Sequence, residues 1–338
     1  MRFDAKGFLP VTLAVAALAL GAWSDAKAQP AVSGAAQDFP TKSVTLVVPF
    51  PPGGGVALAA RVLAEKLAPR LGQPVLVDHR PGVGGLAGAN MVARSAPDGH
   101  TLLVGPNTIA ISPHILTKGA GGGVDVLKDL VPIVMPAYVP MVLVVNPQLG
   151  VKTTAELIAL AQHNPGLPYA SAGNGSPMHF AGEMFKKAAG VDMQHIPYKG
   201  VQPSVTDTLG GQVKILFVSL GSGVIPLIRS GRLVPLAVTE KRRTQFLPDL
   251  PTLTELGIRG VEVDAWYGVL APTGTPSAVI ARLNQEINTV LELPDVRERL
   301  NSAGIEVRGG TAEAFAAAMR EDYARYGRIA QELAIRSD

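Results

Sequence analysis

The chain has 338 residues and nearly balanced charge, with 30 Lys and Arg against 27 Asp and Glu. It contains no Cys, which excludes disulfides, thiolate catalysis and cysteine-ligated metal sites. Its basic residues form no stripe and its aromatic residues are sparse, so the composition argues against nucleic-acid binding.

The first 28 residues have the pattern of a secretory signal peptide. Arg2 and Lys6 form a basic start, an apolar run follows over residues 8–23, and Ala26-Lys27-Ala28 places small residues at the cleavage positions. The run is rich in Ala and shorter than the roughly 20 apolar residues that a membrane-spanning helix needs. We expect cleavage after Ala28 and export to the periplasm, without a lipid anchor because there is no Cys. An uncleaved N-terminal anchor is the alternative.

Short apolar runs alternate with helical patterns in the first part of the chain. We expect strands at Ser43–Pro49, Val75–Asp78 and Thr101–Val104, separated by helices at Val56–Leu71 and Leu86–Ser95. The first helix repeats its apolar residues at the spacing of one helix face. This alternation predicts an α/β fold, in which a largely parallel sheet is covered by helices on both faces.

The alternation continues in the second part. Its expected elements are, in order, a strand at Met141–Val145, a helix at Thr154–Gln162, a strand at Pro168–Ser171, a helix at Pro177–Ala189, and strands at Ile215–Ser219 and Pro235–Val238. A β-rich stretch at Val261–Ala271 is long enough to cross between two domains. Three helices, at Pro276–Leu291, Pro294–Ala303 and Ala312–Leu333, close the chain. The length suits two domains of about 150 residues each.

Two loops share one design. Phe50-Pro51-Pro52-Gly53-Gly54-Gly55 follows a strand and precedes a helix, and Ser171-Ala172-Gly173-Asn174-Gly175-Ser176 does the same further on. Free N–H groups in the first turn of a helix bind anions, and glycine lets an anion approach the backbone. Both loops stand at the carboxyl ends of strands, where open α/β sheets bind ligands. The alternative is that both are ordinary tight turns.

Catalytic and cofactor motifs do not stand out. The glycines of Gly82–Gly88 have the wrong spacing for a dinucleotide fingerprint, and neither a Walker sequence nor G-x-S-x-G occurs. The six His lack the spacing of metal ligands. Since no nucleophile, base and orienting group come together, we expect no catalytic residue, no metal and no cofactor.

Several short segments, in this order along the chain, resemble the tripartite tricarboxylate transporter receptors, the Bug family of periplasmic binding proteins. They are VTLVVPFPPGGG at Val44–Gly55, RPGVGG at Arg80–Gly85, APDGH at Ala96–His100, YASAGNGS at Tyr169–Ser176, PYKG at Pro197–Gly200, LGGQV at Leu209–Val213 and WYG at Trp266–Gly268. Each segment alone is a weak signal, and their combination across nearly all of the mature chain is specific.

The resemblance implies a type II periplasmic-binding-protein fold. Its two lobes would be joined by two crossing strands, near Val134–Val142 and Val261–Leu270. Lobe 1 would be discontinuous, with residues 42–137 and 267–338, and lobe 2 would span residues 138–266.

The same resemblance implies a monomeric receptor that captures a small carboxylate and delivers it to inner-membrane permease subunits. The family's two ligand loops map onto the two loops described above. The predicted ligand-binding residues are Phe50, Pro51, Pro52, Gly53, Gly54, Asn107, Ser171, Ala172, Gly173, Asn174, Ser176, His179 and Tyr198. A periplasmic enzyme acting on a small carboxylate is the alternative. Effector domains of LysR-type regulators share the fold, but they need a DNA-binding helix-turn-helix where this chain has its signal segment.

Three places depart from the family's pattern. Val56-Ala57 stands where Thr-Asp is common, Pro106 where Thr is common, and Val218 where Asp is common. Polar side chains that could hold an amino or hydroxyl group are therefore missing. Our hypothesis is a less polar acid, aromatic or aliphatic, without an amino group. The alternative is that these positions only pack.

Overall fold

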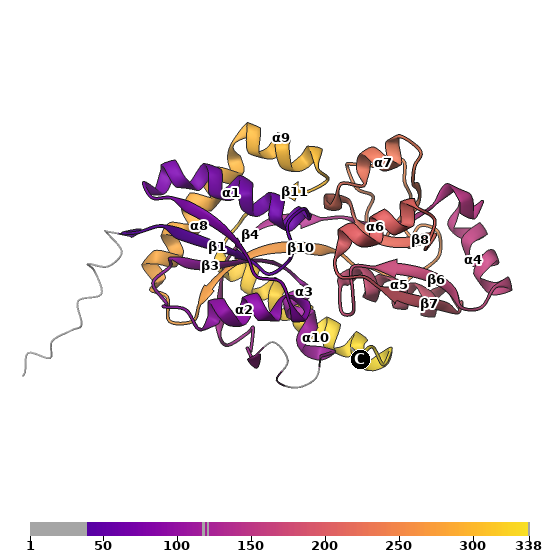
Figure 1. Ribbon diagram of the computed structural model, residues 1–338, viewed down its shortest axis with the longest axis horizontal. Helices are drawn as coiled ribbons and strands as arrows, with labels where there is room; N and C mark the ends of the chain where they lie inside the picture. The colour runs from indigo at the N-terminus through magenta and orange to yellow at the C-terminus, as the bar shows by residue number, and fades with distance from the viewer. Residues whose placement is uncertain (1–38, 117–118, 120–121, 337–338) are drawn as a thin grey trace, which may run out of the picture.

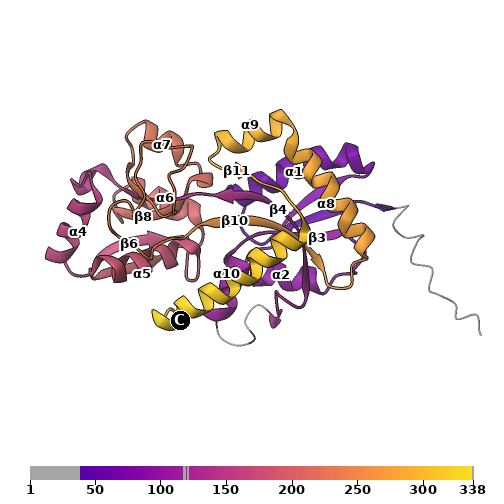
Figure 2. The same cartoon turned by 180° about the vertical axis from the view of Figure 1, so that it is seen from behind.

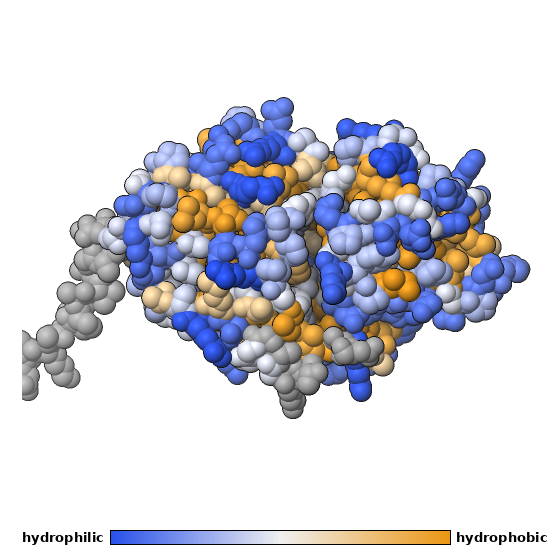
Figure 3. Space-filling view, viewed as in Figure 1, coloured by the Kyte–Doolittle hydropathy of each residue, from blue (hydrophilic) through white to orange (hydrophobic). Residues whose placement is uncertain are grey.

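Two β-sheets flanked by helices lie side by side along the long axis of the protein (Figures 1 and 2). The computed structural model describes residues 39–116, 119 and 122–336, so the predicted signal peptide at residues 1–28 lies outside it. A furrow separates the two halves on the face shown in Figure 3. Within the described residues, no helix combines the length and the hydropathy that a membrane span requires.

The first sheet has six strands in the order β11-β4-β10-β3-β1-β2. Their bounds are β1 (Val44–Val48), β2 (Val75–His79), β3 (Thr101–Pro106), β4 (Leu130–Val139), β10 (Ala265–Pro272) and β11 (Glu306–Val307). β1 pairs parallel with β2 and β3, as expected for strands joined through helices. β10 pairs antiparallel with β3 and β4, and β11 antiparallel with β4. The parallel βα units are thus confirmed, and antiparallel strands complete the sheet.

Helices cover both faces of this sheet. They are α1 (Gly55–Leu71), α2 (Leu86–Ala93), α3 (Thr108–Ile111), α8 (Ser277–Glu292), α9 (Pro294–Ser302) and α10 (Ala312–Glu332), with 3₁₀ turns η1 (Val83–Gly85) and η2 (Ser112–His114). Successive residues of β3 point to opposite faces, so Leu102 and Val104 enter one core cluster and Leu103 enters the other. The α1 side chain of Leu63 belongs to the first cluster, and Phe315 of α10 to the second.

The second sheet has five strands in the order β7-β6-β8-β5-β9. Their bounds are β5 (Met141–Val145), β6 (Leu167–Ser171), β7 (Met193–Pro197), β8 (Ile215–Ser219) and β9 (Val234–Val238). Its helices are α4 (Thr154–His163), α5 (Pro177–Ala189), α6 (Val201–Leu209) and α7 (Ile225–Arg229), with 3₁₀ turns η4 (Pro147–Leu149) and η5 (Leu220–Ser222). β6 pairs parallel with β7 and β8, whereas β5 pairs antiparallel with β8 and β9.

Several elements escaped the sequence patterns, for physical reasons. β4 contains Pro132 and Pro136, which have no N–H to donate and weaken a strand signal. β7 is an edge strand with mixed burial, so it lacks a clear apolar run. α6 contains Pro203 in its first turn. The crossing strand predicted near residues 134–142 is two strands, β4 and β5, separated at Pro140. The predicted lobe boundaries at 137/138 and 266/267 stay a prediction.

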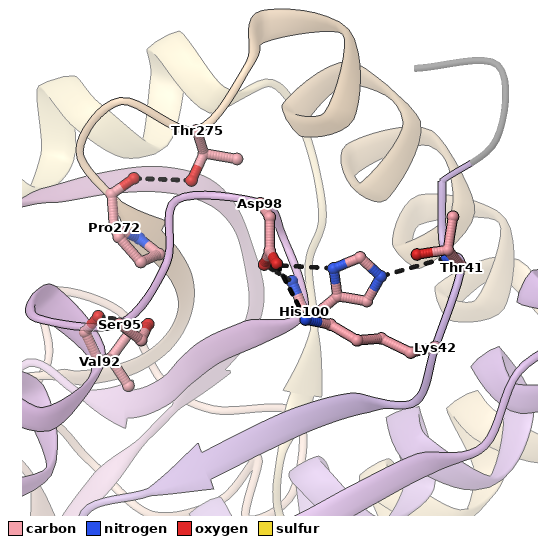
Figure 4. Close-up of polar contacts among 8 residues, drawn as sticks. All are labelled: Thr41, Lys42, Val92, Ser95, Asp98, His100, Pro272 and Thr275. Carbon is pink, nitrogen blue, oxygen red and sulfur yellow. Dashed lines mark hydrogen bonds and ion pairs between the residues drawn. The ribbon is translucent and has the colours of Figure 1, made fainter. Parts of the chain in front are cut away.

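The Ala96–His100 segment anchors the beginning of the described chain (Figure 4). The Asp98 carboxylate accepts hydrogen bonds from the His100 N–H at 3.0 Å and from Lys42 Nζ at 3.2 Å. His100 Nε2 accepts one from the Thr41 N–H at 3.2 Å. Gly99 has φ of +84°, and a Cβ there would lie 2.4 Å from a Val279 methyl carbon. This family-like segment therefore has a structural role where β1 begins.

Candidate ligand-binding site

A cavity of about 170 Å³ lies where loops of the two sheets face each other. From the first sheet and its helices it is lined by Phe50, Pro51, Pro52, Gly54, Gly55, Val56, Gly84, Pro106, Thr108, Ala265 and Tyr267. From the second it is lined by Met141, Ala172, Asn174, Ser176, Pro177, Met178, Lys199, Gly200, Val201, Gln202, Pro203, Ser219 and Ser222. We call it the interlobe cavity. Both predicted ligand loops reach it, one from each sheet.

The first loop leaves a helix N-terminus open toward this cavity. Gly54 is the N-cap of α1, and no side chain makes a capping hydrogen bond there. The first-turn N–H groups of an uncapped helix keep their hydrogen-bonding capacity and carry the positive end of the helix dipole. Gly54, Gly55 and Val56 all line the cavity. An anion placed here would accept hydrogen bonds from first-turn N–H groups, which have no acceptor within the helix.

Two side chains hold the first loop in place. His79 at the end of β2 has its Nδ1 2.9 Å from the Phe50 carbonyl oxygen. Gln202 of α6 donates from Nε2 to the carbonyls of Gly53 and Ser222, at 3.3 Å each. The amide of Gln202 therefore ties a loop of the first sheet to the second sheet.

The second loop is built differently, because its own serine caps the helix. The Ser176 hydroxyl accepts a hydrogen bond from the His179 N–H at 3.2 Å and donates to the Gly173 carbonyl at 2.8 Å. Both bonds lie inside the loop–helix junction. The hydroxyl therefore serves the helix as its N-cap. Asn174 lies between these groups and lines the cavity.

The predicted ligand residues separate into two groups. Those that line the cavity are Phe50, Pro51, Pro52, Gly54, Ala172, Asn174 and Ser176. Those that lie outside its lining are Gly53, Asn107, Ser171, Gly173, His179 and Tyr198. Asn107 is fully buried and donates to the Asp264 carbonyl at 3.1 Å, and the Tyr198 hydroxyl donates to Asp207 at 2.9 Å. Contact of any of the thirteen with a ligand stays a prediction.

The sequence reasoning missed several lining residues that follow strand ends. Thr108 follows the end of β3 by two residues, Ser219 is the last residue of β8, and Ser222 ends the η5 turn that follows β8. Because ligands of open α/β sheets bind at the carboxyl ends of strands, this rule could have found them. Lys199 lies in the PYKG segment, beside the predicted Tyr198. Gln202 had no local signal, since its role depends on a loop far away in sequence.

The interlobe cavity contains little charge. Lys199 is the one charged side chain among the described residues that line it, and none of those lining residues is Asp or Glu. Of the positions that depart from the family's pattern, Val56 and Pro106 line the cavity. Ala57 and Val218 are fully buried and lie outside its lining. Two of the four departing positions therefore belong to the cavity wall, and the other two belong to the packed core.

A larger cavity of about 780 Å³ lies on the other side of β10. We call it the hinge-side cavity. Trp266 and Asp264, the residue before β10, line it, whereas Ala265 and Tyr267 line the interlobe cavity. This is the side-chain alternation expected along a strand. The charged lining residues of the hinge-side cavity are Glu240, Lys241, Arg242, Arg243, Glu262, Asp264, Glu306, Arg308, Glu321, Asp322 and Arg325.

Carboxyl groups in the hinge-side cavity lie close to one another and to polar partners. The Tyr138 hydroxyl donates to Asp264 at 3.0 Å, and the Trp266 ring N–H donates to Asp322 at 2.7 Å. Burial, followed by the neighbouring carboxylate of Asp264, raises the pKa of Glu240 to about 8. The same two causes raise the pKa of Asp322 to about 6. Among the described residues, no group of His, Asp and Glu could hold a metal ion.

A family model described as the tripartite tricarboxylate transporter family receptor matches residues 59–335. The chain belongs to this receptor family. Solved structures agree with the assignment. The periplasmic binding protein BugD is 32% identical, with a TM-score of 0.81, over 89% of this chain and 100% of that one. The α/β periplasmic-binding fold predicted from the sequence is therefore confirmed.

Two further receptor-family neighbours were solved with carboxylates. An R. palustris protein with adipate is 34% identical, with a TM-score of 0.83, over 88% of this chain and 99% of that chain. MatC from Rhodopseudomonas palustris with bound malate is 31% identical, with a TM-score of 0.79, over 86% and 99%. The receptor family and these neighbours are binding proteins, so the chain is a solute-binding receptor.

Proposed function

We propose that this receptor captures a small carboxylate in the interlobe cavity, in the periplasm, and delivers it to the membrane permease of a tripartite transporter. The observation that carries the proposal is the uncapped N-terminus of α1, which opens into a cavity without a lining carboxylate. Backbone N–H groups there would bind one carboxylate, because a helix N-terminus favours negative charge. Closure of the two lobes would complete the site from the second loop.

The ligand we propose is an acid without an amino group. An ammonium group in the interlobe cavity would find no lining Asp or Glu among the described residues, and burying it unpaired is costly. Val56, Met141, Met178 and Val201 give the cavity apolar surface for an aliphatic or aromatic body. Adipate and malate, found in two relatives, also lack an amino group.

Calorimetric titration of the purified mature protein tests this proposal. The panel contains adipate, malate, benzoate, aspartate and glutamate. We expect at least one acid without an amino group to bind and to raise the melting temperature, because a ligand of the folded state stabilises it. Tight binding of aspartate or glutamate instead would contradict the ligand class.

The enzyme alternative is tested with the same samples. Each acid is incubated with the protein and then quantified by chromatography. A receptor leaves the acid unchanged after many hours, whereas turnover of any acid would favour an enzyme.

Delivery and location need tests in cells. N-terminal sequencing of the periplasmic fraction should find a chain that begins at Gln29. Deletion of the coding sequence should abolish uptake of the bound acid, and restoring it should recover uptake. A mature protein confined to the cytoplasm would contradict the proposal.

A further inference from the structure

Two imidazoles are stacked behind the second ligand loop. The rings of His179 and His195 lie 3.8 Å apart with an interplanar angle of 7°. His179 is in the first turn of α5 and only 6% exposed, and His195 is in the middle of β7. Neither ring lines the interlobe cavity. The pair therefore supports the loop, and ligand contact by His179 stays a prediction.

Each imidazole holds a different point of the loop. His179 Nδ1 accepts a hydrogen bond from the Gly175 N–H at 3.2 Å. His195 Nε2 lies 2.6 Å from the Ser171 hydroxyl oxygen, which accepts a hydrogen bond from the Gly173 N–H at 3.1 Å. The two rings thus fix the loop at both glycines, one directly and one through Ser171.

The hydrogen bonds determine where the protons lie. The Gly173 carbonyl already accepts the Ser176 hydroxyl at 2.8 Å and the Ser176 N–H at 3.1 Å, which occupies both lone pairs. The Ser171 hydroxyl lies 3.3 Å from this carbonyl oxygen but only 2.6 Å from His195 Nε2. We therefore assign the hydroxyl proton to the shorter contact, with an unprotonated His195 Nε2 as the acceptor. His179 Nδ1 is unprotonated as well, because it accepts from an N–H. Both rings must be neutral for this arrangement.

The surroundings favour neutral rings. Burial lowers the pKa of His179 to about 4, with Lys186 as a second cause. Burial, followed by His179, lowers the pKa of His195 to about 3. Lys186 also contributes to the shift at His195, whereas Glu183 opposes it. Glu183 is itself engaged by the Tyr169 hydroxyl at 2.6 Å and by Lys186 at 2.9 Å.

The loop needs such support because its glycines have positive φ. Gly173 has φ of +126° and Gly175 has φ of +72°. Glycine loses much conformational freedom when it is held in one such conformation. In this conformation the N–H groups of Gly173 and Gly175 point at the supports. Among the described residues nothing accepts the N–H of Asn174, which lines the cavity.

We propose that His179 and His195 are positioning residues, which hold the Ser171–Ser176 loop so that the Asn174 N–H faces a bound carboxylate. This inference rests on the proposed function only for the identity of the ligand. It separates the predicted loop residues that hold the loop from Asn174, whose N–H is left for the ligand.

Substitutions at His179 test the inference in the full mature chain. His179→Phe keeps a flat ring and removes the acceptor, whereas His179→Asn keeps an acceptor near the Nδ1 position. His163→Phe, at an exposed histidine on α4, is the matched control. With adipate as the probe, we expect at least a tenfold weaker Kd for H179F, recovery to within threefold for H179N, and no change for H163F. Wild-type affinity in H179F would overturn the proposal.

Nuclear magnetic resonance separates a failure of this inference from a failure of the proposed function, because it needs no ligand. Amide hydrogen exchange at Gly175 should be at least tenfold faster in H179F than in the wild type. The imidazole nitrogen shifts of wild-type His179 and His195 should stay those of neutral rings from pH 7.5 to 5.5. If adipate fails to bind but both results hold, the ligand assignment is wrong and the support is real. Unchanged exchange at Gly175, or titration of His179 in this range, would overturn the proposal.

Discussion

The interlobe and hinge-side cavities occupy opposite faces of one strand and differ in how their polar groups are used. On the interlobe side of β10, Tyr267 lines a cavity with little charge. Among the described residues, Lys199 is the one charged side chain that lines it. On the hinge side, Trp266 faces eleven charged residues. Many of those charges already have partners, such as Arg308 with Glu306 at 2.9 Å and Trp266 with Asp322 at 2.7 Å.

The difference shows that charge density alone does not identify a ligand site. A carboxylate gains most from donors that are free before it arrives, since a donor already paired must first lose its partner. The N-terminus of α1 offers such donors without any charged side chain. Because the two cavities share β10, variants on either side can test whether their roles are separate.

The largest effect is expected for Gly55→Ala at the start of α1. A Cβ at Gly55 would lie 2.4 Å from the Tyr267 hydroxyl oxygen and 2.6 Å from the Gly221 carbonyl oxygen. The carbonyl is backbone of η5, directly after β8 of the second sheet, and cannot move aside as a side chain could, so the two halves would be forced apart. We expect G55A to lose about 1–3 kcal/mol of unfolding free energy and most of its adipate affinity.

Gly54→Ala is the comparison variant for this prediction. Gly54 has φ of −86°, and a Cβ there would lie no closer than 3.9 Å to Val201. Urea denaturation should place G54A near the wild type and G55A well below it. Equal stabilities of G54A and G55A would show that the close approach at Gly55 is unimportant.

A pH-dependent effect is expected at Glu240 in the hinge-side cavity. The pKa of Glu240 rises from an ordinary 4.5 to about 8 in the folded state, so the folded state binds an additional proton between these values. The free energy of unfolding therefore falls as pH rises through this window, by up to about 1.4 kcal/mol per pH unit. Glu240→Gln should flatten this slope and leave adipate affinity at pH 7 unchanged.

Denaturation at pH 5.5, 6.5 and 7.5 measures the slope. Glu298→Gln, at an exposed residue of α9, serves as the control and should keep the wild-type slope. If E240Q changes adipate affinity as strongly as stability, the two faces of β10 are coupled and the separation proposed here is wrong.

The smallest effect is expected for Lys199→Gln. Lys199 is exposed, so its attraction for an anion is screened by water. We expect about two- to fivefold weaker binding of adipate, with the loss decreasing at high salt. Lys152→Gln, at another exposed lysine of the same half, should have no effect. A hundredfold loss in K199Q would make this side chain, and not the backbone, the main contact.

Much of the fold was predictable because its signals are local. The apolar runs of β1 and β6, the helix faces of α1 and α5 and the glycine loops between them depend on residues close in sequence. The strands that lack an apolar run were missed, such as β4 with Pro132 and Pro136. The site was predictable only in part. Loop residues such as Phe50 and Asn174 line the cavity, whereas His179 and Tyr198 lie outside its lining.

The sequence by itself determined the α/β class, the family, and the two glycine loops at strand ends, because local hydrogen bonding and apolar spacing encode these features. Only the tertiary structure decided how each loop is used. The amide of Gln202 reaches Gly53 across 149 residues, and the imidazoles of His179 and His195 stack although they lie on different elements. Such contacts depend on the packing of distant segments, which no local pattern encodes.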